Sequence, residues 1–334
     1  MITTLIGNYP KIAEGAYGTR LIGTISRWQR QEITDEELEQ VYQDITRAIL
    51  QEQEQAGIDL LTDGQIRWED IVTPIARRLD GFEVNGLTRW FNNNVYYRRP
   101  ILHRAPVRQG PILVQEYQFA RSCTTRPVKA VLPGPYTVMA VSEDRYYKNP
   151  RRFVRRMAEI LNEEARDLAA AGAPVIQFDD PAIGFGWPGG RHSSKAKTTD
   201  MKLALEGLQI ATRGVKTKTA VVTYFGALNG RLSQLLNAPV DIIGVDVVSS
   251  PTTLAALKKL RRIPKALALG CLDARNTKLE SVKDLRAVFR IASKLVPPDH
   301  LYVNPNCGLE FLPHRQALAK VQRLAEAARA FKES

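Results

Sequence analysis

Polar and ionisable side chains follow the short apolar runs of this sequence, at the points where the runs stop. Carboxylates at such points could act as general acids or bases or hold a cation, and a thiol could act as a nucleophile or a metal ligand. In chain order these residues are Asn8, Asp63, Gln65, Asp179, Asp180, Tyr224, Asp246, Asp273, Arg275, Asn304 and Cys307.

Carboxylates crowded into one cavity would raise some of their pKa values, or would require a cation such as a metal ion or the side chain of Arg67 or Arg275. Each aspartate taken alone has a second interpretation, because an Asp that follows a strand often caps the next helix. Cys307 also has two interpretations, since a cysteine in a turn often serves only as a small packing residue. The residue types alone leave these alternatives open.

The apolar runs alternate with segments of helical period. The capping-box pair Thr34 and Glu37 begins one such segment, and another ends at Gly172. The runs read TTLIGNYP, GIDLLTDGQ, VKAVLPGP, PVIQFDDP, AVVTYFG, DIIGVDVV, ALALGCLDAR and LYVNPNCG. Later helices are expected at Lys202–Arg213, Thr252–Arg261, Ser281–Leu295 and His314–Phe331.

Near-continuous apolar strands that alternate with helices indicate a parallel sheet covered on both faces. Eight such units predict an α/β fold in which residues 1–334 form a single (β/α)8 TIM barrel, whose strand ends converge on one mouth. An open doubly wound sheet is the alternative, but no G-x-G-x-x-G motif follows the first run. The aromatic, basic segment 81–126 is predicted to be a β-hairpin insertion between strands 2 and 3, acting as a lid or a dimer surface.

Composition narrows the partners and the cellular setting. The net charge is +12, but the basic residues are scattered and no nucleic-acid-binding motif is present, so an acidic small molecule or protein is a better partner than nucleic acid. No apolar run approaches the roughly 20 residues that span a bilayer, which argues against a membrane protein. The N-terminus does not resemble a signal peptide, and three cysteines in 334 residues favour a reducing, cytoplasmic setting.

Four stretches resemble strand-end motifs of the cobalamin-independent methionine synthase family, in that family's order. They are DLLTDGQIRWEDIV, PVKAVLPGPYTV, VIQFDDPAI and LYVNPNCGLE. The resemblance covers the family's catalytic C-terminal barrel, as in its short "core" forms. It implies a zinc ion at the barrel mouth that binds the homocysteine thiolate, and a methyl group donated by a folate or by a methylcorrinoid on a methyl-carrier protein.

Two positions match the family's metal ligands. Cys307 corresponds to the last zinc-binding cysteine, and Asp246 takes the place of a ligating glutamate. The family's His-x-Cys pair aligns with residues 224–226, which read Tyr-Phe-Gly, so the zinc set is incomplete. His103 and His192 could reach the mouth only from loops. The oxygen-rich rim suits Mg²⁺ or Mn²⁺ better than zinc.

The resemblance also implies roles for other residues. Asp179 matches the carboxylate that holds the substrate amino group, and Arg275 stands where the family has a catalytic histidine. Asn8 replaces a serine and Gln65 a glutamate among the substrate-binding positions. We therefore expect Asp179, Arg275 and Tyr224 to be catalytic, and we expect the substrate to be bound by Asn8, Asp63, Gln65, Asp179, Asp180 and Asn304.

Three functions follow from these observations. The first is a methionine-synthase-like methyltransferase that acts on a thiol such as homocysteine. The second is a diverged barrel enzyme without the zinc site, of lyase or decarboxylase type, with an aspartate as acid or base and Arg275 or Arg67 holding a small anionic substrate. The third is a non-catalytic homologue that keeps the scaffold.

Overall fold

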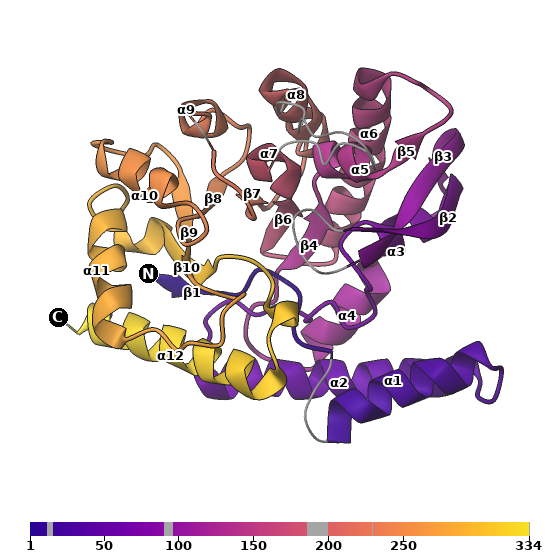
Figure 1. Ribbon diagram of the computed structural model, residues 1–334, viewed down its shortest axis with the longest axis horizontal. Coiled ribbons are helices and arrows are strands. Elements are labelled where there is room, and N and C mark those ends of the chain that lie inside the picture. The colour runs from indigo at the N-terminus through magenta and orange to yellow at the C-terminus, as the bar shows by residue number, and fades with distance from the viewer. Residues whose placement is uncertain (12–15, 90–95, 186–199, 229, 334) are drawn as a thin grey trace.

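A computed structural model describes residues 1–11, 16–89, 96–185, 200–228 and 230–333. Its main sheet has seven strands, and every neighbouring pair in it is parallel (Figure 1). In spatial order the strands are β1 (Ile2–Thr3), β10 (Leu301–Pro305), β9 (Ala266–Leu272), β8 (Ile242–Asp246), β7 (Lys218–Thr223), β6 (Val175–Asp179) and β4 (Ala130–Pro133).

A two-residue segment, Leu60–Leu61, joins the two edges of this sheet. Leu60 forms a parallel bridge with Thr4 next to β1, and Leu61 forms one with Val128 next to β4. The Leu60 amide donates to the Thr3 carbonyl at 3.0 Å, and the Leu61 amide donates to Pro127 at 2.9 Å. The segment is the eighth strand, so the predicted (β/α)8 barrel is confirmed.

Apolar side chains fill the end of the barrel at which the strands begin. They form a small buried cluster of Leu60, Val175, Ala220, Ile242, Ala266, Ala268 and Tyr302. Lys129, just before β4, and Gln177 and Asp179 on β6 are polar residues inside the barrel, and all three are buried. The barrel is therefore closed at one end by apolar packing, and its chemistry is confined to the other end.

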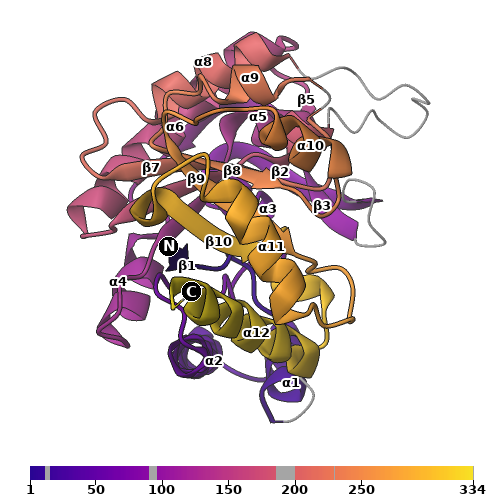
Figure 2. The same ribbon diagram turned by 90° about the vertical axis from the view of Figure 1, so that its left-hand side faces the viewer.

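Helices cover the outside of the barrel, and α2 and α12 lie side by side along one flank (Figure 2). The predicted capping box is present, because Thr34 Oγ1 accepts from the Glu37 amide and the Glu37 carboxylate accepts from the Thr34 amide. The long helices are α1 (Ala16–Gln29), α2 (Asp35–Ala56), α4 (Val114–Ser122), α6 (Pro150–Ala170), α8 (Met201–Ala211), α10 (Pro251–Lys258), α11 (Val282–Ala292) and α12 (His314–Lys332). The short ones are α3 (Thr73–Arg77), α5 (Pro135–Val141), α7 (Pro181–Phe185), α9 (Leu232–Leu235) and the 3-10 turns η1 (Pro298–His300) and η2 (Leu309–Phe311).

The hairpin insertion lies between the second and third barrel strands, but its bounds differ from the prediction. Strand β2 (Leu79–Arg89) pairs antiparallel with β3 (Tyr96–Arg108), and β3 also pairs with β5 (Glu143–Asp144). The rest of the predicted segment 81–126 contains α4, which is the barrel helix that leads to the third strand. An aromatic and basic composition does not separate a hairpin from the helix that follows it, so the prediction ran too far.

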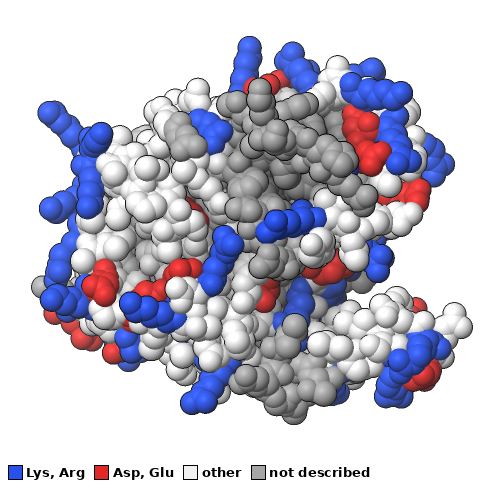
Figure 3. Space-filling model, viewed as in Figure 1, with Lys and Arg blue, Asp and Glu red and all other residues white. Residues whose placement is uncertain are grey.

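Charged side chains are spread over the surface. Figure 3 shows Lys and Arg scattered around the outline of one face, with Asp and Glu among them. Within the described residues, no helix is both long and apolar enough to cross a membrane.

Candidate active site

A pocket lies at the mouth of the barrel, where the strands end. Asn8 follows β1, Tyr224 follows β7 and Glu310 follows β10, so three separate strands contribute to its wall. The complete lining is Asn8, Glu69, Asp70, Ile71, Tyr97, Tyr224, Phe225, Glu310 and Phe311. The mouth therefore gathers side chains that are far apart in the sequence, as the strand-end pattern predicts.

The hairpin supplies one wall of this pocket through Tyr97 on β3. The Tyr97 hydroxyl donates to the Val141 carbonyl, and Thr73 Oγ1 on α3 donates to the Arg98 carbonyl at 2.9 Å. Asp70 caps α3 by accepting from the amides of Val72 and Thr73, each at 2.7 Å. These hydrogen bonds fix the hairpin and the loop after the second strand against the mouth.

Asp179, at the end of β6, lies in a hydrogen-bonded row inside the barrel. Its Oδ2 accepts from the Tyr224 hydroxyl at 3.0 Å, and its Oδ1 accepts from Gln177 Nε2 at 2.6 Å. Gln177 Oε1 in turn accepts from Lys129 Nζ at 2.6 Å, and the same ammonium donates to the Leu5 carbonyl. A buried cation is thus connected to a buried carboxylate through one amide.

Burial dominates the electrostatics of this row. It raises the pKa of Asp179 to about 7, against the opposing effects of the Gln177 hydrogen bond and the Lys129 charge. It also lowers the pKa of Lys129 to about 7, although the Asp179 charge opposes the shift. Both groups are therefore poised to change charge near neutral pH, which is a property typical of functional sites.

The structure places the neighbouring Asp180 in a different role. Its Oδ1 accepts from the Thr137 hydroxyl at 2.5 Å, and its backbone amide donates to the Val222 carbonyl. Thr137 lies on α5, so Asp180 attaches that helix to the barrel rather than lining the mouth pocket. Burial nevertheless raises the pKa of Asp180 to about 7.

Asp63 and Gln65 line a second, smaller cavity with Trp68 and Lys129. Burial raises the pKa of Asp63 to about 6, and its Oδ1 accepts from the Gln65 amide at 3.1 Å. Gln65 has a positive φ of 49° and is 1% exposed, and neither of its side-chain polar atoms has a partner among the described residues. An unpaired buried amide is costly, so this position favours a ligand or a bound water.

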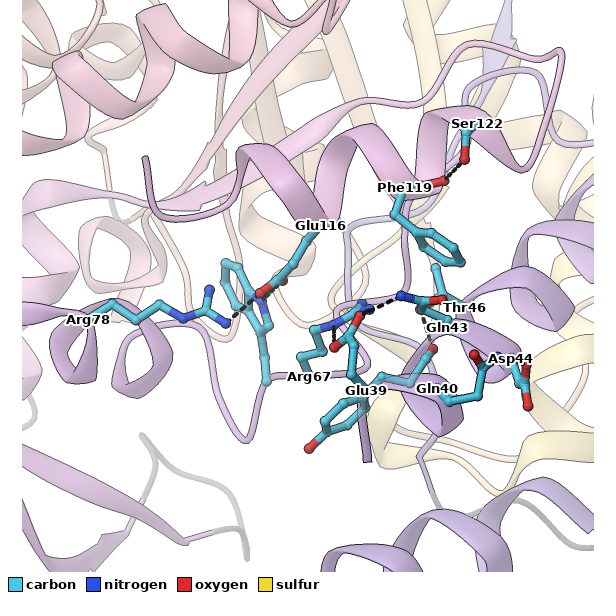
Figure 4. Close-up of polar contacts among 12 residues, drawn as sticks. Glu39, Gln40, Gln43, Asp44, Thr46, Arg67, Arg78, Glu116, Phe119 and Ser122 are labelled. Atoms are coloured by element: carbon cyan, nitrogen blue, oxygen red, sulfur yellow. Dashed lines mark hydrogen bonds and ion pairs between the residues drawn. The ribbon is translucent and has the colours of Figure 1, made fainter. Parts of the chain in front are cut away.

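Arg67 does not point into the mouth, contrary to the expectation that it could hold an anionic substrate there. Figure 4 shows its guanidinium against Glu39, with hydrogen bonds of 3.1 and 2.5 Å, and beside the Phe119 ring. It also lies over the Tyr42 ring, 5.5 Å from the centroid. The side chain thus joins α2 to α4 on the flank of the barrel.

Arg275 lies at the rim, where its guanidinium is 5.7 Å from the centre of the Phe225 ring. Its side chain is exposed, and its backbone amide donates to Asp273 Oδ1 at 2.9 Å. Since Phe225 lines the mouth pocket, Arg275 stands next to the pocket without being part of its wall.

The two predicted metal ligands do not form a zinc site with their surroundings. Cys307 is fully buried, and its thiol faces the Gly308 carbonyl at 3.6 Å. Asp246 Oδ1 accepts from the amides of Val248 and Ser249, and its Oδ2 accepts from Asn306 at 3.3 Å. The Asp246 carboxylate is therefore already engaged in holding the loop after β8.

The remaining donors do not complete the set. Tyr224, at the position where the resemblance implies a histidine ligand, directs its hydroxyl to Asp179. The described residues contain no group of three or more His, Cys, Asp or Glu side chains that could hold a metal ion. His103 pairs with Glu83 on the hairpin at 3.0 Å, and His192 lies outside the described residues. A tetrahedral zinc needs four ligands, so these residues do not fit it.

Sequence reasoning missed the acids of the mouth pocket, Glu69, Asp70 and Glu310, and also Lys129 in the second cavity. Burial raises the pKa of Glu310 to about 7, and its Oε2 has no partner among the described residues. A Cβ on Gly308 would overlap this carboxylate, so a substitution there would require the flexible Glu310 side chain to move. Two signals were available in the sequence. Lys129 is the one lysine in the apolar run VKAVLPGP, and Glu310 is an acid three residues after Cys307.

Buried oxygen atoms without partners are concentrated at the strand ends. Asn8 and Asn304 are 6% and 2% exposed, and the Oδ1 atom of each lacks a hydrogen bond among the described residues. Buried polar atoms are rarely left unpaired in folded proteins. These positions therefore fit a ligand, which is consistent with the predicted substrate-binding role of Asn8 and Asn304.

The fold and the mouth define a (β/α)8-barrel enzyme whose pocket is acidic and aromatic. The family described as "Cobalamin-independent synthase, Catalytic domain" matches residues 1–330. The chain belongs to this cobalamin-independent methionine synthase family.

Individual relatives agree with this assignment. A methionine synthase of Sulfolobus acidocaldarius is 30% identical over 96% of this chain and 88% of its own length. A methionine synthase of Saccharolobus solfataricus is 29% identical over 99% of this chain and 95% of its own length. The structure of a B12-independent methionine synthase from Shewanella sp. W3-18-1 superposes with a TM-score of 0.81 at 26% identity, covering 99% of this chain and 97% of that one. Family membership supports an enzyme of the methyltransferase class and does not favour the lyase, decarboxylase or non-catalytic alternatives.

Proposed function

We propose that this protein is a methionine-synthase-like methyltransferase that passes a methyl group to a thiol such as homocysteine at the barrel mouth. Membership of the family along almost the whole chain supports this function. The Shewanella relative was solved in complex with selenomethionine, an amino acid with a methylated side chain. The observation that carries the proposal here is the buried carboxylate of Asp179, which Tyr224 and Gln177 orient at the end of β6.

In this proposal Asp179 binds the ammonium group of the amino-acid substrate. A carboxylate with two fixed hydrogen-bond donors keeps one geometry and gains a charge-assisted bond when the ammonium arrives. Asn8 and Asn304 offer to the same substrate oxygens that have no partner in the described part of the chain, and Gln65 offers an amide from the adjacent cavity. Arg275 stands at the rim, where it could receive the substrate carboxylate. No step is assigned to zinc, because the retained donors do not fit it, and a folate or methylcorrinoid donor is not distinguished.

Methionine formation from homocysteine tests the proposal directly. Purified protein is supplied with homocysteine and, in separate reactions, with methyl donors of the folate, corrinoid and onium classes, and methionine is quantified by mass spectrometry. Asp179→Asn should lower the rate at least about tenfold, because the substituted amide loses the charge that attracts the ammonium. Asp299→Asn is the matched control, since Asp299 is exposed at the opposite end of β10. Failure of every donor to yield methionine would contradict the proposal.

A further inference from the structure

Three polar side chains from distant parts of the chain meet on the flank where α2 and α12 lie side by side (Figure 2). Glu52, on α2, accepts through Oε2 from the Tyr9 hydroxyl at 3.0 Å. His314 Nε2, at the start of α12, lies 2.8 Å from the same oxygen. The Tyr9 and His314 rings also meet edge to face, with centroids 6.0 Å apart. The cluster therefore joins the segment after β1 to two outer helices.

Burial fixes the direction of the Tyr9 hydrogen bond. Tyr9 is fully buried, whereas the side chains of Glu52 and His314 are 19% and 17% exposed. Burial raises the pKa of Tyr9, and the negative charge of Glu52 raises it further. The hydroxyl therefore stays protonated near neutral pH and donates to the carboxylate, and such a charge-assisted bond is stronger than one between neutral groups.

The backbone next to this tyrosine holds the loops that follow two other strands. The Tyr9 amide donates to the Gly64 carbonyl at 3.0 Å, and the Asn8 carbonyl accepts from the Leu309 amide at 2.9 Å. These bonds connect the segment after β1 to the loop after the second strand and to the loop after β10. Tyr9 thus lies where three of the segments at the barrel mouth meet.

The conformation of Gln65 is held by the same segment. Gly64 and Gln65 both have a positive φ, 74° and 49°, and a residue other than glycine adopts such a φ only at a cost. Gly64 packs against Tyr9, since a Cβ built on Gly64 would lie 3.1 Å from the Tyr9 Cβ. The Gln65 side chain lies against Gly7, where an added Cβ would be 2.8 Å from Gln65 Oε1. Residues 7–9 therefore set the direction of this side chain.

We propose that Glu52 is a positioning residue for the substrate site and acts through Tyr9. By holding Tyr9 it keeps Asn8 and Gln65 in the arrangement that binds the amino-acid substrate. The inference rests on the proposed function for the identity of the substrate, while the holding of the loops is independent of it.

The two binding side chains need this support from outside the site. Asn8 Oδ1 and both polar side-chain atoms of Gln65 have no hydrogen-bond partner among the described residues, so these atoms do not fix their own side chains. Their placement follows from the backbone that the Tyr9 cluster holds. Binding groups must stay within roughly 0.5 Å of their productive geometry, so a shift of this backbone would weaken binding.

Methionine binding to the full chain measures the positioning. In titration calorimetry Glu52→Ala should lower methionine affinity about fivefold, a loss of the size that one hydrogen bond provides. Tyr9→Phe keeps the buried ring and removes only the hydroxyl, so it should cause a similar loss, and the double variant should bind no worse than either single one. Gln55→Ala, at an exposed position further along α2, is the matched control and should leave the affinity unchanged.

A second background separates positioning from a general loss of structure. Asn8→Ala combined with Gln65→Ala removes the two side chains that Glu52 positions. Adding Glu52→Ala to this background should change methionine affinity less than about twofold, because the changes act on one unit. A full fivefold loss in this background would overturn the proposal, and so would an unchanged affinity when Glu52→Ala is made alone.

Hydrogen exchange tests the holding of the loops without a ligand. In Glu52→Ala the amides of Tyr9 and Leu309 should exchange with deuterium at least about threefold faster than in Gln55→Ala, because their hydrogen bonds open more often. Unchanged exchange of both amides would overturn the inference, whether or not methionine binds. Faster exchange in a protein whose wild type binds no methionine would instead contradict the proposed substrate and leave the holding of the loops in place.

Discussion

The Tyr224 hydroxyl donates to Asp179 Oδ2 at 3.0 Å, and Tyr224 occupies a position at which the sequence resemblance implies a metal-binding histidine. The two residues come from adjacent strands, β7 and β6. The side chain at this position thus faces the carboxylate that we propose to bind the substrate. Tyrosine in place of the histidine that the resemblance implies would remove one zinc ligand and supply a hydrogen bond to Asp179.

Tyr224→Phe should weaken amino-acid binding. The variant keeps the ring in the pocket but removes the hydrogen bond that stabilises ionised Asp179, so methionine affinity should fall about three- to tenfold. Calorimetric titration with methionine measures the effect. Tyr146→Phe, on an exposed ring, is the control, and an unchanged affinity for Tyr224→Phe would contradict the supporting role of this hydroxyl.

Lys129→Met should shift the pH dependence of the same binding. Burial raises the pKa of Asp179 to about 7, and in the proposed role the ionised carboxylate binds the substrate ammonium group, so affinity should rise as the pH rises through 7. Removing the Lys129 charge removes an interaction that lowers the Asp179 pKa, so the midpoint should move to higher pH. Methionine affinity measured from pH 5.5 to 8.5 tests this shift, and a purely structural role of Lys129 would weaken binding without moving the midpoint.

Glu164→Gln should lower stability markedly. This fully buried carboxylate on α6 accepts from Arg108 at 2.7 Å and from the amides of Ile112 and Leu113, and so fixes the end of the hairpin and the start of α4. Breaking a buried ion pair from one side costs roughly 3 kcal/mol. Urea denaturation measures the loss. Glu163→Gln is the control, since Glu163 lies 3.8 Å from the same arginine but is half exposed.

The free energy of unfolding of Asp180→Asn, measured relative to that of the wild type, should increase as the pH rises. Burial raises the pKa of Asp180 from 3.8 to about 7, so between these values the folded protein holds a proton that the unfolded chain has lost. The free energy of unfolding of the wild type therefore falls with rising pH in this window, and the variant lacks this contribution. Relative to the wild type, the variant should gain roughly 2 kcal/mol between pH 5 and pH 7.5. A pH-independent difference in urea denaturation would contradict the raised pKa.

Zinc content should be well below one ion per chain. Cys307 and Asp246 are the retained ligand positions, and Asp246 is already engaged by two backbone amides and Asn306. Elemental analysis of protein purified without an affinity tag measures the metal. Stoichiometric zinc that disappears in Cys307→Ser would show that residues beyond the described donors complete a metal site.

The barrel could be predicted because each strand is a short apolar run and each following helix carries its own boundary signals. Thr34 with Glu37 and the stop at Gly172 are local features, and α2 and α6 lie where these features predict. The gathering of Asn8 and Tyr224 at one mouth followed from the geometry of parallel strands. The hairpin end was misplaced because its boundary with α4 depends on the docking of Arg108 on α6 rather than on local composition.

The direction of individual side chains could not be predicted from residue types. Asp179 and Asp180 are adjacent, yet one faces the barrel interior and the other caps α5, because successive residues at a strand end point to opposite faces. Arg67 is drawn to Glu39, a partner 28 residues away in the sequence. Lys129 directly precedes the apolar strand β4, and its buried hydrogen-bond partner, Gln177, is on β6.

The short pairing of the Leu60–Leu61 segment with its neighbours should make this the part of the barrel that opens most easily. It is joined to each neighbouring strand at a single residue pair, whereas the other strand pairs of the barrel share at least two. Thermal breathing of the barrel should therefore start along this seam, and the amide protons of Leu60 and Leu61 should exchange with deuterium sooner than those in the middle of β7. The chain runs from this seam directly into Asp63, Gln65 and Asp70, so widening of the seam would loosen the rim on the side where the hairpin stands.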